Sequence, residues 1–363
     1  MALIQAVTLF EFVAAVFHAV GVSEHDARTA ADVLSWANLH GIDTHGVRNL
    51  RNLYIDPLLA GKLKPRAINK ILFESTNSAR IDGAGGLGLV GATKAMDFVI
   101  EKARETGIGL VSMRNSFHFG AAGYYAMRAV PKDMIGLSMS GNFFAEGAEH
   151  GVRPIFGSQP LLSTNPLSFA FPTDKEPPFL LDMATSVVPY NRVRMYQEEN
   201  RSIPLGWGLD ANGQPTTNPA ELRHLLPLGG SRELGGHKGF GLGLVVEILC
   251  AILSGGWEAT GEVSPVNEYQ MYKQHNASHF FGAIRLDMFR PANEFKRDMD
   301  ALIRAIHAAP PAANHERVIY PGEIEAKTKK HRIATGIPLS KAVASDLREL
   351  SEQFDITLDI GEV

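Results

Sequence analysis

Three polar segments of the chain carry side chains suited to proton transfer. His45 follows Thr44 near an expected helix start, so the threonine hydroxyl can hydrogen-bond the imidazole or cap the helix. His118 follows the apolar stretch 108–113, and ligands of α/β proteins bind beyond the carboxyl ends of strands. Asp182 also follows an apolar stretch, where a buried carboxylate needs a partner, usually a histidine. These residue types indicate general acid–base chemistry, with a cap or a turn as the alternative explanation for each.

A further segment indicates anion binding rather than metal binding. Lys238 stands at the start of an apolar segment, where a lysine opposes the helix dipole and a bound anion would offset that effect. A solvated lysine is the alternative. His40 and His45 are separated by five positions, whereas two helical metal ligands need a spacing of three or four to share a face. We therefore expect no metal site.

One glycine-rich segment fits the dinucleotide-binding pattern G-x-G-x-x-G. It spans residues 83–88, follows a short strand candidate and precedes a helix. Asp82 would direct its negative charge towards a pyrophosphate, and the pattern arises easily by chance in a chain with 35 glycines. A turn is therefore favoured over a Rossmann-type site.

The composition excludes several classes of protein. The 363 residues carry 35 basic and 39 acidic side chains with no basic block, so nucleic acid is not an expected partner. Cys250 is the only cysteine, which excludes an intramolecular disulfide and favours a reducing, cytoplasmic location. The apolar N-terminus lacks a basic region, and an amphipathic helix is expected there rather than a signal peptide.

Residues 239–257 form an apolar stretch that is long enough to span a bilayer, so a membrane-spanning helix is an alternative to a soluble protein. Glu247 lies in its middle, where a carboxylate costs about 2.5–3.5 kcal/mol in a membrane. We therefore expect a fully buried helix and no membrane partner.

The order of elements predicts an α/β protein. Helices are expected over the first 60 residues, with Ser23 as the N-cap of one that ends near Gly41, and alternating strands and helices follow. Residues 201–237 are expected to form a long ordered loop. Further expected elements are listed here: strands at 108–113, 134–140, 167–171, 179–183 and 280–286, and helices at 92–105, 120–129, 293–308 and 341–354.

Taken together, the motifs resemble those of the malate/L-lactate dehydrogenase family, which includes ureidoglycolate and sulfolactate dehydrogenases, 2,3-diketogulonate reductase and piperideine-2-carboxylate reductases. The matching stretches occur in family order and span nearly the whole chain. They are THGV (44–47), HFGAAGYYA (118–126), STNPLSFAFP (163–172), LDMATS (181–186), GWGLDANGQPTTNP (206–219), HKGFGL (237–242), YPGE (320–323) and GIPL (336–339).

The resemblance implies an α/β fold whose mixed-sheet core binds NAD or NADP without a Rossmann domain, so the pattern at 83–88 is not the cofactor site. It also implies a homodimer with its active site near the subunit interface. Residues 1–74 and 290–363 are expected to form one discontinuous helical domain on the substrate side. Residues 75–289 are expected to form the core that binds the cofactor.

The resemblance also assigns roles to single residues. His45 is the expected proton donor to the substrate oxygen, Thr44 and Asp182 orient it, and His118 is an alternative acid–base residue. A carboxylate beside the imidazole would favour the imidazolium form. The expected cofactor contacts are His118, Phe119, Gly120, Ala121, Ala122, Thr164, Asn165, Asp182, Met183, Ala184, His237, Lys238, Gly239, Pro321, Gly322 and Glu323.

The substrate-binding residues depart from the family pattern. The family usually carries an arginine four positions after the histidine, where this chain has Asn49, and Arg48 stands one position earlier. One residue is about 100° around a helix, so Arg48 need not face the site, and Arg51 is a further candidate. Arg48, Asn49, His118 and Asn142 are the expected substrate contacts.

The leading hypothesis is an NAD(P)-dependent oxidoreductase that interconverts a small 2-hydroxy acid and its 2-oxo acid. One alternative is a reductase of cyclic imine carboxylates on the same fold. The other is a catalytically silent nucleotide-binding protein.

Overall fold

The computed structural model describes residues 2–141, 150–256 and 277–362. Its centre is a seven-stranded mixed sheet with the order β2-β3-β4-β10-β5-β6-β7, in which only β3 and β4 are parallel neighbours. The strands are β2 (Lys70–Glu74), β3 (Ser78–Asp82), β4 (Ile108–Ser116), β5 (Met134–Gly141), β6 (Leu167–Phe171), β7 (Phe179–Met183) and β10 (Ala277–Arg285). This mixed sheet with its helices confirms the predicted α/β class.

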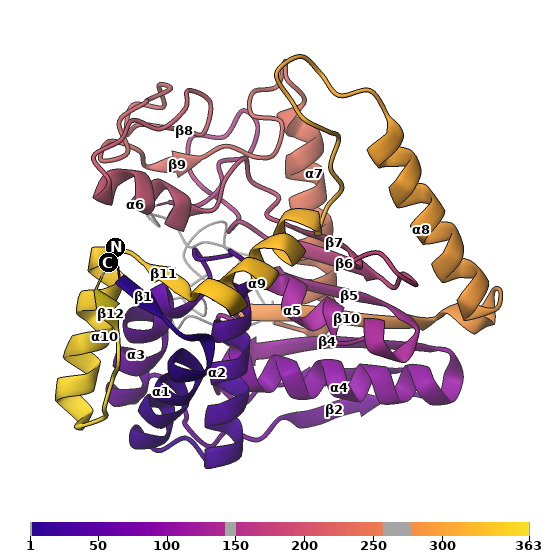
Figure 1. Ribbon diagram of the computed structural model, residues 1–363, viewed down its shortest axis with the longest axis horizontal. Helices are drawn as coiled ribbons and strands as arrows, with labels where there is room; N and C mark the ends of the chain where they lie inside the picture. Colours follow the sequence, from indigo (N-terminus) through magenta and orange to yellow (C-terminus); the bar gives the residue numbers. More distant parts are fainter. Residues whose placement is uncertain (1, 142–149, 257–276, 363) are drawn as a thin grey trace, which may run out of the picture.

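Different helices cover the two faces of the sheet (Figure 1). Side chains along β4 point alternately to one face and the other. Val111 and Met113 belong to the large core that includes α4 (Gly88–Thr106). Ser112 points to the other face and hydrogen-bonds the carbonyl of Leu249, in the π-helical segment Ile248–Ile252 that continues α7 (Gly236–Glu247). Helix α5 (Ala122–Met127) packs against β5 and β6.

The N- and C-terminal segments meet in a second, smaller sheet beside the first. Strand β1 (Ala2–Ile4) pairs with β11 (Ile337–Leu339) on one side and β12 (Gly361–Glu362) on the other. Figure 1 shows both termini near one end of α10 (Lys341–Phe354). Helix α10 contacts α1 (Ala6–Ala19), which packs against α2 (Glu24–Leu39). The remaining elements are α3 (Asp56–Leu59), α6 (Tyr190–Glu198), β8 (Gly208–Leu209), β9 (His224–Leu225), α8 (Ala292–Ala308) and α9 (Glu323–Thr335).

At two elements, contacts cross the boundary of the predicted domain division. Strand β2 lies in the predicted helical domain but pairs with β3 in the large sheet. Helix α8 was also assigned there, yet Asp300 on it accepts hydrogen bonds from the backbone N–H groups of residues 174–176, beyond β6. The division itself stays a prediction.

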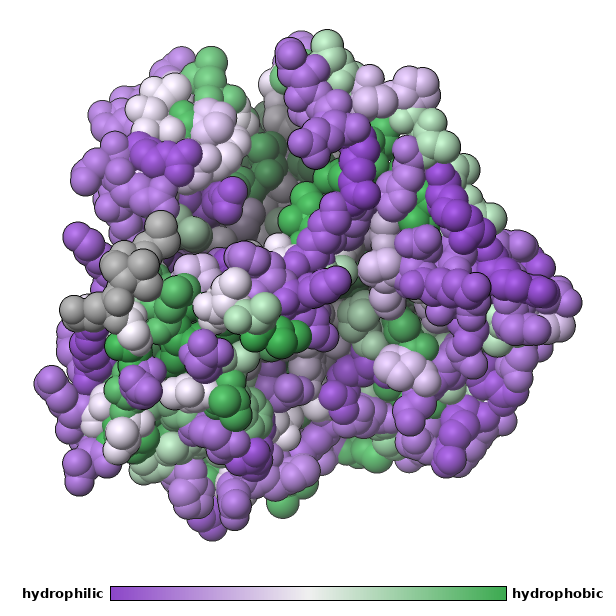
Figure 2. All heavy atoms as spheres, in the orientation of Figure 1, coloured by the Kyte–Doolittle hydropathy of each residue, from purple (hydrophilic) through white to green (hydrophobic). Residues whose placement is uncertain are grey.

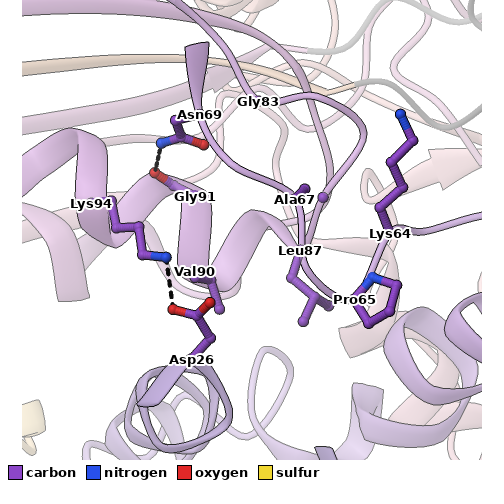
Figure 3. A pocket seen from close by; sticks show the side chains of 11 residues that line it. Asp26, Lys64, Pro65, Ala67, Asn69, Gly83, Leu87, Val90, Gly91 and Lys94 are labelled. Atoms are coloured by element: carbon purple, nitrogen blue, oxygen red, sulfur yellow. Dashed lines mark hydrogen bonds and ion pairs between the residues drawn. The ribbon is translucent and has the colours of Figure 1, made fainter. Parts of the chain in front are cut away.

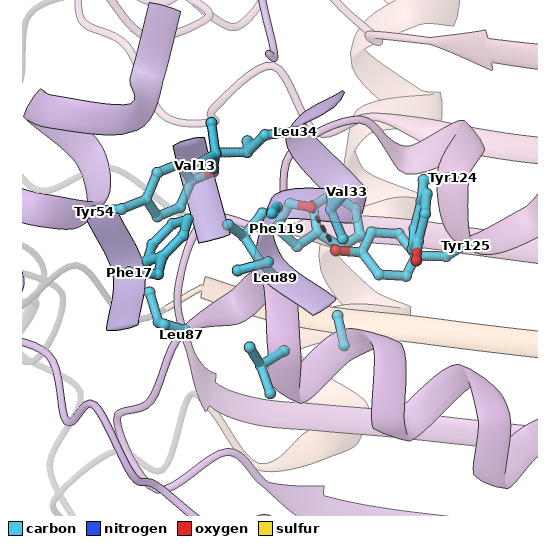
Figure 4. Packing of buried hydrophobic residues seen from close by; sticks show 14 of the residues in the cluster. Val13, Phe17, Val33, Leu34, Tyr54, Leu87, Leu89, Phe119, Tyr124 and Tyr125 are labelled. Carbon is cyan, nitrogen blue, oxygen red and sulfur yellow. Dashed lines mark hydrogen bonds between the residues drawn. The ribbon is translucent and has the colours of Figure 1, made fainter. Parts of the chain in front are cut away.

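The large core joins the helical part of the chain to the sheet. Figure 4 shows aromatic and aliphatic side chains from α1 and α2 packed against those that follow β4. Phe119 stacks on Tyr125 with ring centroids 4.8 Å apart, and the Tyr125 hydroxyl donates to the Phe119 carbonyl. Ser23 caps α2 by accepting a hydrogen bond from the N–H of Asp26, as the sequence predicted.

The segment that begins at Gly239 is not the fully buried helix that we expected. It forms most of α7 and the π-helical turn after it, and several apolar side chains remain on the surface: Val245 (49% exposed), Ile248 (53%), Ile252 (47%) and Leu253 (55%). Glu247, the charged residue in the middle of this segment, is 2% exposed and accepts a hydrogen bond from Asn165. Within the described ranges no helix is long and apolar enough to cross a membrane.

Candidate active site

A cavity of about 520 Å³ lies where the segment after α2, the end of β7 and the start of α6 converge. This volume falls within the range of roughly 300–1,000 Å³ typical of small-molecule sites. Figure 2 shows that the surface is hollowed between the lobe that contains α6, β8 and β9 and the rest of the molecule. The lining residues are Gly41, Ile42, Thr44, His45, Gly120, Ala121, Ala122, Thr164, Pro166, Asp182, Met183, Ala184, Ser186, Val187, Val188, Pro189, Arg192, Trp207, Leu228 and Glu325.

His45 lies on a turn between α2 and a 3₁₀ turn at Val47–Asn49, rather than on the helix start that we expected. The turn is held by Asn38 at the end of α2, whose side-chain oxygen accepts the N–H of Val47 at 2.8 Å. Its amide group donates to Asp43 at 2.8 Å. Gly46 is required here, because a Cβ at this position would stand 2.0 Å from the Asn38 oxygen.

The same turn is tied to distant parts of the chain. Asp43 accepts two hydrogen bonds from Arg332 on α9, at 2.7 and 2.8 Å. The carbonyl oxygen of Thr44 accepts the side-chain amides of Asn49, at 3.0 Å, and of Asn191 on α6, at 2.7 Å. The orientation of His45 therefore depends on α2, α6 and α9 together.

The Thr44 hydroxyl is 2.8 Å from Nδ1 of His45, which is the contact predicted between these two residues. Burial lowers the pKa of His45 to about 4. The expectation that a carboxylate partner would favour its imidazolium form is therefore wrong for this structure. Desolvation outweighs any neighbouring charge, and the ring is neutral at pH 7.

His118 lies beside His45, with near-parallel rings whose centroids are 5.8 Å apart. Its Nδ1 accepts the backbone N–H of Gly120 at 3.3 Å and is 2.5 Å from the Tyr54 hydroxyl. Because Gly120 N–H can only donate, Nδ1 is the acceptor and the proton of the neutral ring is on Nε2. Burial, together with the nearby His45 and His279, lowers the pKa of His118 to about 3. The ring is thus a neutral hydrogen-bond donor through Nε2.

Asp182 lines the cavity but is not joined to His45 as predicted. Its Oδ2 accepts the N–H of Gly123 at 2.7 Å. Within the described residues no hydrogen bond links Asp182 to Thr44 or His45. Burial raises the pKa of Asp182 to about 6, against the effect of the Gly123 hydrogen bond, and the charge of Glu325 raises it further.

The predicted candidates for binding a substrate carboxylate all have other partners. Arg48 forms a two-pronged ion pair with Glu198 on α6, at 2.7 and 2.6 Å. Asn49 is 4% exposed and bonds the Thr44 carbonyl, and Arg51 pairs with Glu349 at 3.3 Å. None of the three lines the cavity. Asn142 lies outside the described residues.

Apart from His118, described above, the predicted cofactor contacts divide into three groups. Seven of them line the cavity: Gly120, Ala121, Ala122, Thr164, Asp182, Met183 and Ala184. Four of them, Gly120, Ala121, Ala122 and Ala184, have small side chains. His237, Lys238 and Gly239 form the first turn of α7, where the backbone at Gly239 packs directly behind the cavity residue Leu228.

The other predicted contacts have structural partners instead. Phe119 is 2% exposed and stacks on His279 with centroids 4.5 Å apart. The buried Asn165 donates to Gly243 and Glu247. Pro321 accepts the N–H of Leu180, and a Cβ at Gly322 would stand 2.8 Å from that nitrogen. Glu323 pairs with Arg317, Lys327 and His307.

The glycine-rich segment 83–88 forms the turn that we favoured. Figure 3 shows the space beside it, bordered by the ion pair between Lys94 and Asp26 at 2.7 Å. The space has a volume of about 10 Å³, enough for no more than a water molecule. A Cβ at Gly88 would stand 2.1 Å from the Phe117 carbonyl, so close packing explains a glycine at that position.

Sequence reasoning missed several lining residues, among them Arg192, Trp207 and Glu325. Arg192 and Glu325 belong to α6 and α9, which are predominantly polar helices. Helix α6 has a narrow apolar face formed by Tyr190, Val193 and Tyr196, and on α9 only Glu323 is buried. The motif at 206–219, quoted for the family resemblance, contained Trp207 but gave it no role.

Comparison with known proteins identifies the class. Residues 4–348 match the family described as malate/L-lactate dehydrogenase. The malate dehydrogenase of Pyrococcus abyssi is 42% identical over 353 residues, covering 96% of this chain and 94% of that protein. The L-sulfolactate dehydrogenase of Methanocaldococcus jannaschii is 36% identical over 93% of each. The crystal structure of malate dehydrogenase from Entamoeba histolytica matches with a TM-score of 0.90 at 31% identity, covering 99% of both chains.

The chain therefore belongs to the malate/L-lactate dehydrogenase family, which confirms the resemblance seen in its motifs. It is an oxidoreductase that acts on a CH–OH group.

Replacing Gly46 tests the turn that presents His45. In Gly46→Ala, the new methyl group would displace the Asn38 side chain and leave the buried Val47 N–H without its acceptor. An unpaired buried group costs about 1–3 kcal/mol. We expect turnover to fall at least about tenfold with a lower melting temperature, measured by steady-state kinetics and thermal denaturation.

Gly241→Ala is the matched control, because a Cβ at that helical position would meet no described atom within 4 Å outside the backbone of its own helix. It should keep normal kinetics and gain slightly in stability. Normal kinetics in Gly46→Ala as well would show that the turn does not need a glycine.

Buried histidines predict an acid-sensitive fold. Burial lowers the pKa of His279 to about 3, and His45 and His118 are lowered too. Below about pH 6.5 the unfolded chain takes up protons that the folded chain does not. The contribution of these neutral histidines to the free energy of unfolding is therefore complete above about pH 6.5 and is lost as the pH falls towards 3–4. The melting temperature should fall over this window, and less steeply in His279→Gln.

The exposed His315 provides the control. His315→Gln should leave the pH slope unchanged. An identical slope in His279→Gln and the parent protein would remove His279 from this effect.

Proposed function

We propose that this protein is an NAD(P)-dependent oxidoreductase that interconverts a small 2-hydroxy acid and its 2-oxo acid. The observation that carries the proposal is the pair of neutral histidines, His45 and His118, at and beside a cavity of ligand size. The relatives named as malate and L-sulfolactate dehydrogenases support the substrate class.

In this proposal His45 exchanges the proton with the substrate oxygen. The Thr44 hydroxyl bonds Nδ1 and fixes the ring, so Nε2 is the nitrogen available to the substrate. A neutral imidazole can accept the hydroxyl proton during oxidation. In the reverse direction an anionic substrate beside the ring favours the imidazolium that must donate. His118 donates a hydrogen bond through Nε2 and orients the same oxygen.

The residues around the cavity suit a nicotinamide cofactor, which supplies or accepts the hydride when bound. The wall formed by Gly120, Ala121, Ala122 and Ala184 carries only small side chains and can lie against a flat ring. Thr164 and Asp182 provide polar groups at its edge. The first turn of α7, with Lys238 exposed, is the proposed contact for the cofactor phosphates.

The two alternatives are weaker. A reductase of cyclic imine carboxylates would use the same cavity, but the curated relatives named above are dehydrogenases of hydroxy acids. A catalytically silent protein would not need His45 at the cavity wall with its Nδ1 held by Thr44.

The proposal is tested by following oxidation of NADH and of NADPH with a panel of 2-oxo acids and with piperideine-2-carboxylate. We expect turnover with at least one 2-oxo acid. In His45→Ala the rate should fall by about 10²–10⁴-fold, the usual contribution of general acid–base catalysis. His25→Ala removes an exposed histidine from α2 and is the control.

Cofactor binding without turnover of any 2-oxo acid would favour the silent protein. Turnover of the cyclic imine alone would favour the reductase. Full activity in His45→Ala would remove His45 from the role of proton donor.

We further propose that the protein is a homodimer located in the cytoplasm, where its single, unpaired Cys250 stays reduced. An exposed apolar face supports the dimer. Val245, Ile248 and Ile252 follow one another at helical spacing on the surface of α7 and the turn after it. A cavity of about 490 Å³ connects Leu253 at the end of this row with Phe73, which is 60% exposed on β2. Apolar patches of this kind mark protein interfaces.

Analytical ultracentrifugation tests the dimer. The protein should sediment at twice the chain mass of 39.5 kDa. Ile248→Asp should shift it towards the monomer, because the interface would bury an unpaired carboxylate. Val7→Asp places the same charge at another exposed apolar position, 67% exposed on α1, and should leave the dimer intact. A monomeric parent protein would contradict the proposal.

A further inference from the structure

The walls of the active-site cavity carry very little positive charge for a site that binds acids. Among its lining residues, Asp182 and Glu325 are acidic and His45 is neutral at pH 7. Arg192 is the single arginine, and no lysine lines the cavity within the described part of the chain. A 2-oxo acid brings a carboxylate whose negative charge must be balanced in such a site.

The arginines nearest to His45 in the sequence cannot provide this balance as the structure stands. Arg48 is 9% exposed at its side chain and already shares both of its terminal nitrogens with Glu198. Arg51 pairs with Glu349, and neither side chain lines the cavity. To bind a substrate, Arg48 would have to give up both hydrogen bonds of this ion pair.

Arg192 is held close to the catalytic turn by its neighbour in the chain. Asn191 donates its side-chain amide to the Thr44 carbonyl at 2.7 Å and to Asn49 at 3.1 Å. At the far end of α6, Glu198 holds Arg48. The two contacts fix α6 against residues 44–49 at both ends. The first turn of α6, which carries Arg192, therefore stands next to the turn that carries His45.

The Arg192 side chain is also chemically available. It is exposed, and within the described residues its guanidinium has no ion pair or hydrogen bond. A guanidinium presents two parallel N–H donors that match the two oxygens of a carboxylate. Its long side chain reaches from the helix to the cavity it lines.

We propose that Arg192 binds the carboxylate of the substrate, in place of the arginine that the family usually carries at the position of Asn49. The inference rests on the proposed dehydrogenase function. It assigns the orientation of the substrate to α6: the carboxylate lies at the first turn of this helix, and the reacting oxygen lies at His45.

The test compares Arg192→Ala and Arg192→Lys with the parent protein. One measurement is the KM for the best 2-oxo acid, and the other is calorimetric binding of oxamate to protein saturated with NADH or NADPH. Oxamate carries the same carboxylate but cannot be reduced. Losing a charged hydrogen-bonding partner should raise both the KM and the oxamate Kd of Arg192→Ala roughly 10- to 150-fold. The kcat should change less, because this contact is made in ground state and transition state alike.

Arg192→Lys keeps the charge but loses the paired donors, so its values should lie between those of the parent and Arg192→Ala. Arg194→Ala is the matched control: it removes the same charge from the same helix at a position that does not line the cavity. Its KM and oxamate Kd should equal those of the parent protein.

The outcomes separate this inference from the proposed function. If the parent protein turns over no 2-oxo acid, the proposed function fails, and loss of oxamate binding in Arg192→Ala still supports the role of Arg192. If Arg192→Ala instead weakens binding of NADH or NADPH alone, with normal oxamate affinity, Arg192 contacts a cofactor phosphate and the inference is overturned. Unchanged KM and oxamate Kd, or no oxamate binding by the parent protein, overturn it as well.

Discussion

The site depends on one constraint, which is that the polar backbone of a partly buried turn must be fully hydrogen-bonded. The turn that carries Thr44 and His45 has too few residues to satisfy itself. Asn38 accepts from Val47, and the amide of Asn191 on α6 reaches the Thr44 carbonyl. Because buried polar groups are costly when unpaired, these contacts hold the imidazole in one place more firmly than apolar packing alone would.

The same constraint explains why two polar helices stand at the cavity. Helix α9 buries almost no apolar surface, and α6 packs through Val193, Tyr190 and Tyr196. Polar contacts help to position both: Asn191 and Glu198 bind α6 to residues 44–49, and Arg332 on α9 binds Asp43. Helix α6 is also held by the apolar cluster around Val193. A helix placed in this way can carry charged side chains into a ligand site, which a helix packed through a wide apolar face cannot do as readily.

This also sets the limit of what could be predicted from the sequence. Strands β6 and β7, and the cap of α2 at Ser23, follow from apolar runs and N-cap chemistry, and all were predicted. Helix α9 lacks the apolar periodicity by which a helix is recognised, and the short α6 shows it only at Tyr190, Val193 and Tyr196, so both were missed. The exposed face of α7 was missed for the opposite reason. A run of apolar residues predicts burial, and the sequence does not show which of those side chains lie on the surface of the chain. Family motifs predicted nine cavity residues, which are Thr44, His45 and the seven cofactor contacts given above, but they did not give the partners of Arg48 and Asn49.

The asparagine at position 49, where the family usually carries an arginine, then has a physical explanation. Asn49 is 4% exposed, and its amide satisfies the Thr44 carbonyl while its oxygen accepts from Asn191. A neutral amide pair is cheaper to desolvate than a buried guanidinium, which would need a carboxylate beside it. With amides in the interior, the cation can lie on the solvent-facing side of the cavity, at Arg192. The guanidinium stays hydrated there until an acid binds, so no desolvation cost arises in the free protein. Charge is then balanced by the substrate itself, so the free site stores no unpaired buried charge.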